Sequence, residues 1–425
     1  MNAGRAATAC VGLILLTSLV LPAGGGGAPN GWLTAAVRRA AAPASHGAPA
    51  RRAGPVGPPS TLLMEVSTGR ILASADPHRR LPPASLDKLM TFYLALLAIK
   101  GGHLTLTSHV TVSRDAWRVG RTPGSSRMFL NIGDDVTVGQ LLAGLMVASG
   151  NDAAEALAEA IAGSPEQFVE EMNATAARLG MRNTHFVSAH GLPAPGEYTS
   201  AWDMGLLARQ LLLTFPNATA YSSPRYTSYA GIRQANWNNL VFRDPRVDGL
   251  KTGYTESSGF HIVATAKQGS MRLIAIVMGT KTLQQRTASA EAMLTTGFSR
   301  YELVPVAWQQ IVPGAITVYG GTSGRLPLAT PHPVAVLLPR DDHTPLSISE
   351  ELRVAPLAPF RRGQPVGLLT IRSGASVLLT SPVVAAAAVD RGSALAQAWG
   401  TLRYHIDGMF HRRQQAWTGT FTPGQ

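Results

Sequence analysis

Strand-like segments stand on both sides of a long helical stretch, and this order constrains the fold more than any other feature of the chain. Between residues 61 and 72, apolar residues alternate with small or polar ones on either side of a turn at 67–69. Strand patterns return at 259–267 and 272–279. A single sheet assembled from these two distant parts of the chain, with helices packed on it, satisfies the order. We therefore expect an α/β (α+β) domain over residues 60–300.

The residues between these strands have helical periodicity. Apolar side chains recur at spacings of three and four residues, which places them on one face of a helix. This pattern predicts helices at 86–98, 138–148, 153–162, 165–179 and 201–213, and another at 284–297 after the last strand.

A second folded unit is expected because 425 residues exceed what one core usually accommodates. Beyond residue 303, short apolar runs are separated by Gly, Pro and Asp, as in a small all-β fold. These runs, at 315–318, 334–338, 366–371 and 376–379, predict a small β-sandwich domain over residues 303–389.

The N-terminal 28 residues have the order of a secretory signal peptide, with an arginine near the start, an apolar run over 6–21 and then small residues. An uncleaved anchor is the alternative. Residues 29–59, rich in Ala, Pro and Arg, are expected to form a flexible linker. Cys10 is the only cysteine, so the mature chain would have no thiol for disulfides, metal sites or catalysis. Export also argues against nucleic acid as a partner, although the net charge is +12.

The C-terminal tail predicts an amphipathic helix over residues 392–416. Its apolar residues fall at spacings of four, three, four and three, namely Leu395, Trp399, Leu402, Ile406 and Met409. Basic residues follow at 411–413. One interpretation is a helix packed on the β-domain. We favour a basic helix lying on the membrane surface, with Trp399 and Trp417 near the lipid headgroups.

Ser85 and Lys88 stand at the start of the first expected helix, and their spacing puts both side chains on one face. A serine hydroxyl is a weak nucleophile, and a neighbouring amine can take its proton only when that amine is substantially neutral. Burial and a second nearby cation would both lower the pKa of Lys88. Alone, the Ser-x-x-Lys pattern is weak evidence, because about one match is expected by chance in a chain of this length.

Two further triplets support a catalytic role for Ser85 and Lys88. Ser149-Gly150-Asn151 lies between two expected helices, and Lys251-Thr252-Gly253 precedes the strand that starts near Gly259. Each triplet alone would pass for an ordinary turn. Together, Ser-x-x-Lys, Ser-x-Asn and Lys-Thr-Gly in this order are a specific signal for a serine acyl-transfer enzyme.

With these triplets, the sequence resembles the low-molecular-mass penicillin-binding proteins. The likeness is to the serine-type D-alanyl-D-alanine carboxypeptidases, which are related to the class A β-lactamases. Further similar stretches are 124–130, 149–153, 183–186, 190–192, 231–234 and 247–253. The resemblance is strong over residues 60–300 and looser in the second domain and tail. It implies a β-lactamase/transpeptidase-like domain, with helices around an antiparallel sheet.

The resemblance implies that Ser85 is the nucleophile, that Lys88 is the base that activates it, and that Ser149 relays protons. It also implies a substrate-binding set made up of Asn151, Lys251, Thr252, Gly253, Tyr254 and Arg286. Within this set, Asn151 would hold a substrate amide. Lys251, Thr252 and Arg286 would receive the terminal carboxylate of the substrate. The backbone N–H groups of Ser85 and Tyr254 would stabilise the oxyanion.

The implied reaction is removal of the terminal D-alanine from peptidoglycan stem pentapeptides through an acyl-serine. β-Lactams would act as covalent inhibitors, and neither a cofactor nor a metal is expected. The protein would be exported and periplasmic, attached peripherally to the cytoplasmic membrane by its C-terminal helix. Three alternatives remain open: a D,D-endopeptidase, a catalytically silent peptidoglycan-binding protein, and a β-lactamase. The β-lactamase is disfavoured because no Glu-x-x-Leu-Asn segment lies between Asn151 and Lys251.

Three positions depart from the family pattern. Asp87 replaces a usual threonine, and we expect its side chain to face solvent. Trp237 stands where a subset of the family has arginine, and Tyr254 replaces a frequent histidine. These changes are expected to alter substrate preference or the rate of deacylation.

Two other pairs of titratable residues have spacings that could suggest metal binding or acid–base catalysis. His185 and His190 lack a third metal ligand at a suitable spacing, so a structural role for His190 in the cleft loop is favoured. Glu155 and Glu159 lie one helical turn apart, which predicts a solvated helix face rather than an acid–base pair.

Overall fold

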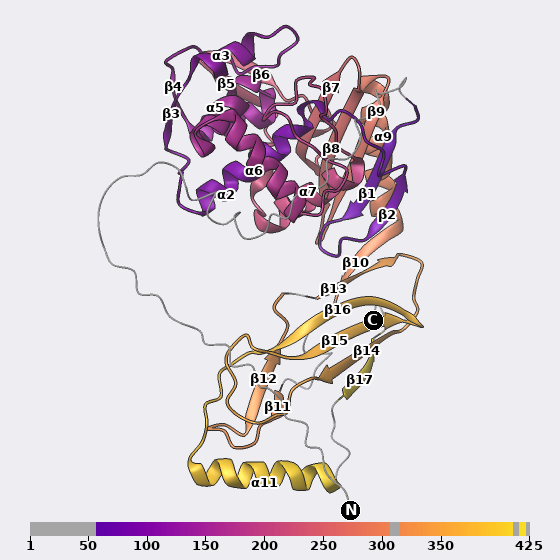
Figure 1. The fold of residues 1–425 in the computed structure, drawn as a ribbon. Coiled ribbons are helices and arrows are strands. Elements are labelled where there is room, and N and C mark those ends of the chain that lie inside the picture. The colour runs from indigo at the N-terminus through magenta and orange to yellow at the C-terminus, as the bar shows by residue number, and fades with distance from the viewer. Residues whose placement is uncertain (1–56, 307–314, 333, 411–415, 422–425) are drawn as a thin grey trace, which may run out of the picture. The chain divides into compact units, whose positions relative to one another are not determined.

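The computed structural model describes residues 57–306, 315–332, 334–410 and 416–421. Its first domain is built on a five-stranded antiparallel sheet in the order β2-β1-β9-β8-β7. The strands are β1 (Ser60–Glu65), β2 (Ile71–Ala75), β7 (Val247–Thr255), β8 (Gly259–Gln268) and β9 (Met271–Thr280). β1 pairs directly with β9, so the prediction of one sheet made from two distant parts of the chain is confirmed (Figure 1).

Helices cover this sheet on both faces because successive side chains of a strand point to opposite sides. Leu62 and Met64 of β1 lie against Gly205 of α7 (Ala201–Thr214). Leu63, between them, belongs to the apolar cluster that contains Leu294 of α9 (Leu283–Arg300). The two helices therefore pack on opposite faces of the sheet.

The helical middle follows the predicted pattern with small shifts at the ends. It contains α2 (Lys88–Lys100), α4 (Val138–Ala143), the π-helical turn η2 (Gly144–Ala148), α5 (Asn151–Ala162) and α6 (Pro165–Arg178). The first predicted helix differs at its start. The 3-10 turn η1 (Ala84–Asp87) precedes α2, and Ser85 lies in this turn.

Several short elements were not predicted. They are α3 (Arg114–Arg121), α8 (Leu240–Arg243), the 3-10 turn η3 (Ala218–Tyr221), the pair β3 (His109–Thr111) with β4 (Asp135–Thr137), and the hairpin β5 (Tyr226–Tyr229) with β6 (Ile232–Ala235). These segments are short and largely polar, so they lack a repeating apolar signal. Lys251-Thr252-Gly253 precede the strand that starts at Gly259, as expected, but they lie inside another strand, β7, which was not predicted.

The second domain is all-β with one helix, as predicted in outline. Its six-stranded sheet has the order β11-β12-β16-β15-β14-β17, and β10 pairs with β13. The strands are β10 (Tyr301–Pro305), β11 (Ala315–Thr317), β12 (Arg325–Ala329), β13 (Ala335–Pro339), β14 (Leu346–Leu352), β15 (Pro365–Ser373), β16 (Ser376–Ala385) and β17 (Ala416–Phe421). One apolar cluster joins side chains of both sheets, including Leu338, Ile348 and Leu369.

The tail forms helix α11 (Ala394–Phe410). Residues 411–415 lie outside the described residues, and Ala416 already belongs to β17, which pairs with β14. The helix expected to continue to residue 416 therefore ends earlier. The described part of α11 carries one arginine, Arg403, and one aspartate, Asp407, so it is not basic.

Among the helices of the described residues, none has both the length and the apolar character needed to cross a bilayer. The expected signal peptide, with Cys10, and the linker up to residue 56 lie outside the described residues.

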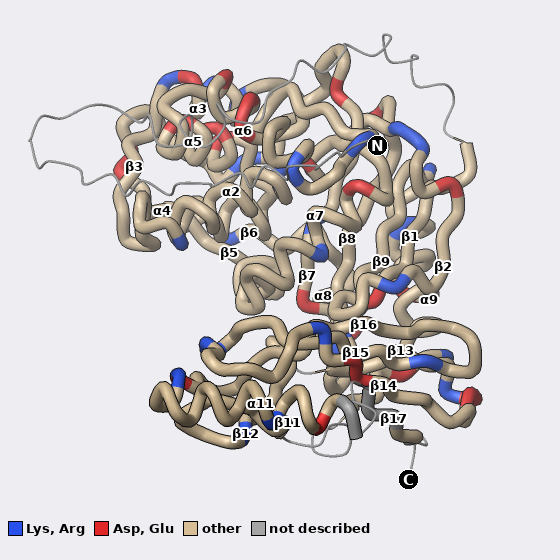
Figure 2. The backbone as a smooth tube through the Cα atoms, turned by 60° about the horizontal axis from the view of Figure 1, so that its bottom comes forward, with Lys and Arg blue, Asp and Glu red and all other residues tan. Residues whose placement is uncertain are grey.

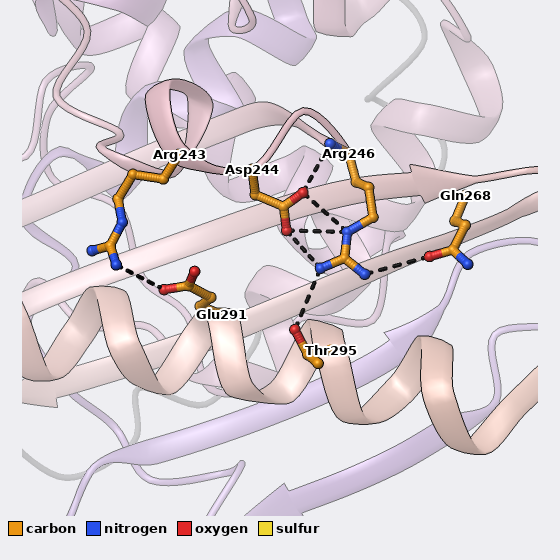
Figure 3. Close-up of polar contacts among 6 residues, drawn as sticks. All are labelled: Arg243, Asp244, Arg246, Gln268, Glu291 and Thr295. Atoms are coloured by element: carbon orange, nitrogen blue, oxygen red, sulfur yellow. Dashed lines mark hydrogen bonds and ion pairs between the residues drawn. The ribbon is translucent and has the colours of Figure 1, made fainter.

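An ion-pair network fixes the entrance to β7, the strand that carries the Lys-Thr-Gly motif (Figure 3). Arg246 donates to both carboxylate oxygens of Asp244, at 3.0 Å from Nε to Oδ1 and 2.7 Å from Nη2 to Oδ2. It also contacts Gln268 of β8 and Thr295 of α9. The side chain of Asp244 is 9% exposed. The network thus ties the start of β7 to a neighbouring strand and to the helix behind it.

We predict that Asp244→Asn lowers the free energy of unfolding by about 2 kcal/mol, the usual value for a charge-assisted hydrogen bond of a buried group. For a domain of this size the melting temperature would fall by about 5 °C. The bond with Arg246 lowers the pKa of Asp244. Its stabilising effect is therefore complete above the unfolded pKa of about 4 and is lost as the pH falls below it.

Glu291→Gln is the matched control, since it removes the more exposed ion pair with Arg243 in the same region. It should change stability by no more than about 0.5 kcal/mol. Equal losses from the two substitutions in thermal unfolding at pH 7 would contradict the importance assigned to Asp244.

Candidate active site

Ser85 and Lys88 form the first half of the site. The Nζ of Lys88 donates to the Ser85 Oγ at 2.9 Å and to the backbone oxygen of His190 at 2.6 Å. Lys88 is completely buried, whereas Ser85 is partly exposed. Burial lowers the pKa of Lys88 to about 7, although nearby carboxyl groups raise it. A buried amine that is partly neutral at neutral pH can accept the proton of the adjacent hydroxyl.

Asp87 does not face solvent, so that expectation is wrong. Its side chain is 0% exposed and lies within hydrogen-bonding reach of the Glu197 carboxyl group. The residue occupies the 3-10 turn η1 with its side chain buried, and the negative charge of this carboxyl pair acts to raise the pKa of Lys88. The sequence pattern could not reveal this because Glu197 is 110 residues away along the chain.

Ser149 and Asn151 form the opposite wall, at the junction of η2 and α5. Ser149 has a left-handed backbone with a φ of 61°, which closes the preceding turn. Its backbone oxygen accepts from the Ser126 Oγ at 2.6 Å, and Asn151 Nδ2 donates to the Ser125 Oγ at 2.7 Å. The Asn151 Oδ1 atom is buried without a hydrogen-bond partner among the described residues, so it is an acceptor available to a ligand.

Lys251 joins this wall to strand β7. Its Nζ donates to the Ser149 Oγ at 2.9 Å and to the Thr252 backbone oxygen at 3.0 Å. The side chain is 1% exposed. Burial, and then the positive charges of Lys88 and Arg286, hold the pKa of Lys251 well below its usual range. The second cation was expected to lower the pKa of Lys88; the structure places the two amines close enough to repel each other, and the pKa values of both are lowered.

The two walls meet along β7, the edge strand of the sheet. Gly253 packs against the η1 turn so closely that a Cβ atom there would lie 3.0 Å from the Pro83 oxygen and 3.3 Å from the Ser85 nitrogen. Only a residue without a side chain fits this approach comfortably. The free edge of β7 thus runs beside Ser85, and the structure brings Ser85, Lys88, Ser149 and Lys251 together at this edge.

Arg286, Trp237 and Tyr254 lie around these residues. Arg286 is 3% exposed, its Nη2 donates to the Trp237 backbone oxygen at 3.4 Å, and its Nε has no partner among the described residues. The Trp237 Nε1 donates to the Ala148 oxygen at 3.1 Å, directly beside Ser149. Tyr254 stacks on Phe260 with ring centroids 4.2 Å apart. Both Trp237 and Tyr254 are 54% exposed, so they present aromatic faces to a ligand.

His261 is a residue that sequence reasoning missed. It is completely buried in β8, where its Nδ1 accepts from the Gly279 N–H at 2.9 Å and its Nε2 lies 3.1 Å from the Pro82 oxygen. These contacts require a neutral ring that carries its proton on Nε2, and burial lowers the pKa of His261 to about 4. The ring fixes the segment before Ser85 to the sheet. A histidine in an otherwise apolar strand was the only signal.

His185 and His190 make separate contacts. His185 Nδ1 lies 3.0 Å from the Gly196 oxygen, whereas His190 supplies its backbone oxygen to Lys88. In the part of the chain that is described, no group of three or more His, Cys, Asp or Glu side chains has an arrangement that could hold a metal ion.

The expectation of a solvated face at Glu155 and Glu159 is wrong for Glu155. Figure 2 shows acidic residues gathered where α3, α5 and α6 meet, and Glu155 there is only 7% exposed. Burial and the neighbouring carboxylates raise the pKa of Glu155 to about 7. Glu159 accepts from the Ser113 Oγ at 2.8 Å. Packing of α3, which was not predicted, against α5 covers this face.

Comparisons with known proteins follow the same division of the chain. The family model of D-alanyl-D-alanine carboxypeptidases matches residues 50–282, and that of the C-terminal domain of penicillin-binding protein 5 matches residues 301–391. The chain belongs to the D-alanyl-D-alanine carboxypeptidase family. The first match includes every predicted site residue except Arg286.

Relatives cover most of the chain. The Escherichia coli D-alanyl-D-alanine carboxypeptidase DacC is 37% identical over 342 residues, which are 80% of this chain and 86% of the relative. The structure of penicillin-binding protein 5 from Haemophilus influenzae aligns with a TM-score of 0.69 and 32% identity, over 81% of this chain and all of the other. The cefotaxime-bound penicillin-binding protein D2 from Listeria monocytogenes aligns with a TM-score of 0.52 and 30% identity, over 56% of this chain and 96% of the other.

The loop after His190 generates a prediction about the site. Gly191 has a φ of 75°, and a Cβ atom there would overlap the Ala84 backbone oxygen next to Ser85. We predict that Gly191→Ala lowers the free energy of unfolding by about 2 kcal/mol more than Gly196→Ala, because the Ala84–Ser85 peptide must move.

Gly196 is a matched control, because it has a φ of 84° in the same loop and nothing near its missing Cβ. Its substitution should cost only the backbone strain, about 1 kcal/mol. Chemical denaturation of both variants gives the comparison, and equal losses would show that the loop does not support the Ser85 turn.

Proposed function

We propose that this protein removes the terminal D-alanine of peptidoglycan stem peptides through an acyl intermediate on Ser85. The observation that carries the proposal is the 2.9 Å contact between the Lys88 amine and the Ser85 hydroxyl, with burial holding the pKa of that amine at about 7. At neutral pH a substantial fraction of Lys88 is then uncharged and able to act as a base.

In the first step, Lys88 takes the proton of Ser85 while Ser85 Oγ attacks the carbonyl carbon of the penultimate D-alanine. The peptide bond breaks, and the departing D-alanine amine receives that proton through the Ser149 hydroxyl, which is held by Lys251. Lys88 then takes a proton from the water that attacks the ester and returns it to Ser85 Oγ as the shortened peptide leaves as its carboxylic acid. The Lys88–Ser85 and Lys251–Ser149 hydrogen bonds are already formed, so little reorganisation of these groups is needed.

The substrate is held by charge and by the sheet edge. Lys251, Thr252 and Arg286 receive the terminal carboxylate, whose negative charge would favour the protonated form of Lys251. Asn151 Oδ1 accepts from a substrate amide. Gly253 lets β7 approach the η1 turn, so an extended peptide along the free edge of β7 would lie beside Ser85. The N–H groups of Ser85 and Tyr254 stabilise the oxyanion.

β-Lactams would react with the same serine because their ring amide takes the place of the scissile peptide bond. The D2 relative, crystallised in a cefotaxime-bound form, supports this assignment. Carboxypeptidase, endopeptidase and β-lactamase action would all use Ser85, so the products distinguish them. We expect D-alanine to be released from a pentapeptide and penicillin to be turned over slowly.

For Ser85 we predict a penicillin adduct of one molecule per chain, mapped to the peptide that contains this residue. Ser85→Ala should abolish both the adduct and D-alanine release, by at least about 1,000-fold. Intact-protein and peptide mass spectrometry provide the measurement. Ser299→Ala, a change at an exposed hydroxyl on α9, is the control and should react as the wild type does. An adduct elsewhere, or fast turnover without D-alanine release, would refute the proposal.

We further propose that the protein is exported to the periplasm and attaches to the membrane surface through α11. Leu395, Trp399, Leu402 and Ile406 are 84%, 65%, 49% and 37% exposed, so one face of the helix is an uncovered apolar stripe. A different face packs on the β-domain, where Tyr319 Oη donates to Asp407 Oδ2 at 2.7 Å. Both sequence interpretations of the tail can therefore hold at once, because they use different faces of the helix.

We predict that Leu395→Ala combined with Trp399→Ala lowers binding to vesicles of phosphatidylglycerol and phosphatidylethanolamine at least about tenfold, because burying each large apolar side chain contributes on the order of 2 kcal/mol. Co-sedimentation measures the bound fraction. Truncation is a poorer test, because residues 416–421 form β17 of the sheet. Val377→Ala, at a 49% exposed position on β16, should bind as the wild type does. Unchanged binding of the double variant would exclude α11 as the anchor.

A further inference from the structure

Two buried carboxyl groups lie together beside the base of the proposed reaction. Asp87 immediately precedes Lys88 and is 0% exposed. Glu197, in the segment before α7, is 6% exposed and reaches the Asp87 carboxyl group. Among the described residues, no Arg or Lys side chain forms a salt bridge with either carboxyl group.

The hydrogen bonds of the pair indicate where a proton must lie. Neither oxygen of Asp87 has a donor among the described residues. Two carboxylates are both acceptors, so they form a hydrogen bond only when one of them is protonated. Glu197 accepts from the Ser188 Oγ at 3.4 Å and from the backbone of Val187, which favours its ionised form. Asp87 is then the protonated member, and burial together with Glu197 raises its pKa well above its usual range.

We propose that Asp87 and Glu197 share one proton and act as a positioning pair, whose single negative charge sets the proton affinity of Lys88. The inference rests on the proposed function of Lys88 as the base. It adds to that function two residues that do not touch the reacting hydroxyl but control how strongly the Lys88 amine binds a proton. Two charges would bind the Lys88 proton too tightly, and none would leave the buried amine too weak a base.

The pair also holds the loop that orients Lys88. Ser188 donates to Glu197, and its Oγ accepts from the Gly191 N–H at 2.9 Å. Between them, the His190 oxygen accepts from the Lys88 Nζ. A carboxylate at position 197 therefore holds Ser188 in place. Through Ser188 it supports the His190 carbonyl, which accepts a hydrogen bond from Lys88.

Other charged groups around Lys88 come from several elements and must be considered in any pH dependence. They are Asp152 of α5, His190 of the loop after Ser188, Lys251 of β7 and, next to Lys251, Arg286 of α9. Asp152 is held by the backbone N–H groups of Met128 and Leu130. Burial, reinforced by the charge of Lys88, keeps His190 neutral, with its pKa lowered to about 3. None of these four groups changes in the variants proposed below.

The test is the pH dependence of the second-order rate constant for acylation of the full-length protein by a fluorescent penicillin. Its lower midpoint reports the pKa of the base in the free enzyme, about 7 for Lys88. Asp87→Asn and Glu197→Gln each replace one carboxyl group by an amide that can still donate to the other, so each single variant keeps one negative charge. Both should keep the wild-type midpoint, whatever their maximal rates.

The double variant, Asp87→Asn with Glu197→Gln, removes the charge. Its midpoint should fall by about one to three pH units, the usual effect of losing one nearby opposite charge. Asp87→Thr with Glu197→Gln removes the same charge with a different side chain and should shift the midpoint equally. This second pair keeps the test intact if the first one folds poorly, which thermal unfolding would reveal.

The outcomes separate the inference from the proposed function. A downward shift in the single variants would mean that both carboxyl groups are ionised, and an unshifted midpoint in both double variants would mean that the pair does not control Lys88. Either result overturns the inference. Absence of any wild-type acylation would instead overturn the proposed function. Glu159→Gln, a partly buried carboxyl group not among those acting on Lys88, is the control and should leave the midpoint unchanged.

Discussion

Removal of two lysine amines from water is the constraint on which the site depends. Lys88 and Lys251 are both buried, and an isolated charge in that environment is costly. The cost is offset by hydrogen bonds to Ser85, Ser149 and two backbone oxygens, and by loss of the charge itself as the pKa values fall. The same burial that opposes folding makes these amines able to exchange protons with their hydroxyl neighbours at neutral pH.

The fold supplies this burial by bringing distant segments to one sheet edge. The η1 turn with Ser85 leads from the first hairpin, the Ser149 turn joins two central helices, and Lys251 comes from a strand near the end of the domain. β7 can approach η1 because position 253 is a glycine, and His261 holds the segment before Ser85 against the sheet. A change in any of these backbone contacts would separate the hydroxyl and amine groups without altering the motifs.

Two of the three departures from the family pattern lie at the border of the site. Trp237 and Tyr254 present exposed aromatic faces there, where they can contact parts of a substrate beyond the scissile bond. The third, Asp87, is buried and lies against Glu197. In the second domain, one face of α11 packs on the β-domain and another is an exposed apolar stripe. The same helix can therefore stabilise the domain and bind a membrane surface.

The sequence by itself determined the sheet built from both sides of a helical middle, the all-β second domain, and the three triplets that carry the chemistry. These features depend on local periodicity and on short motifs, which are readable along the chain. It did not reveal the inward turn of Asp87, the burial of Glu155, the neutral His261 or the place of Lys251 inside an edge strand. Each of these depends on a partner far away in the sequence: Glu197, helix α3, Pro82 and strand β8. Only tertiary packing decides whether such a side chain is buried or exposed to water. Burial in turn shifts the pKa of the side chain and so determines its protonation state and its role in the site.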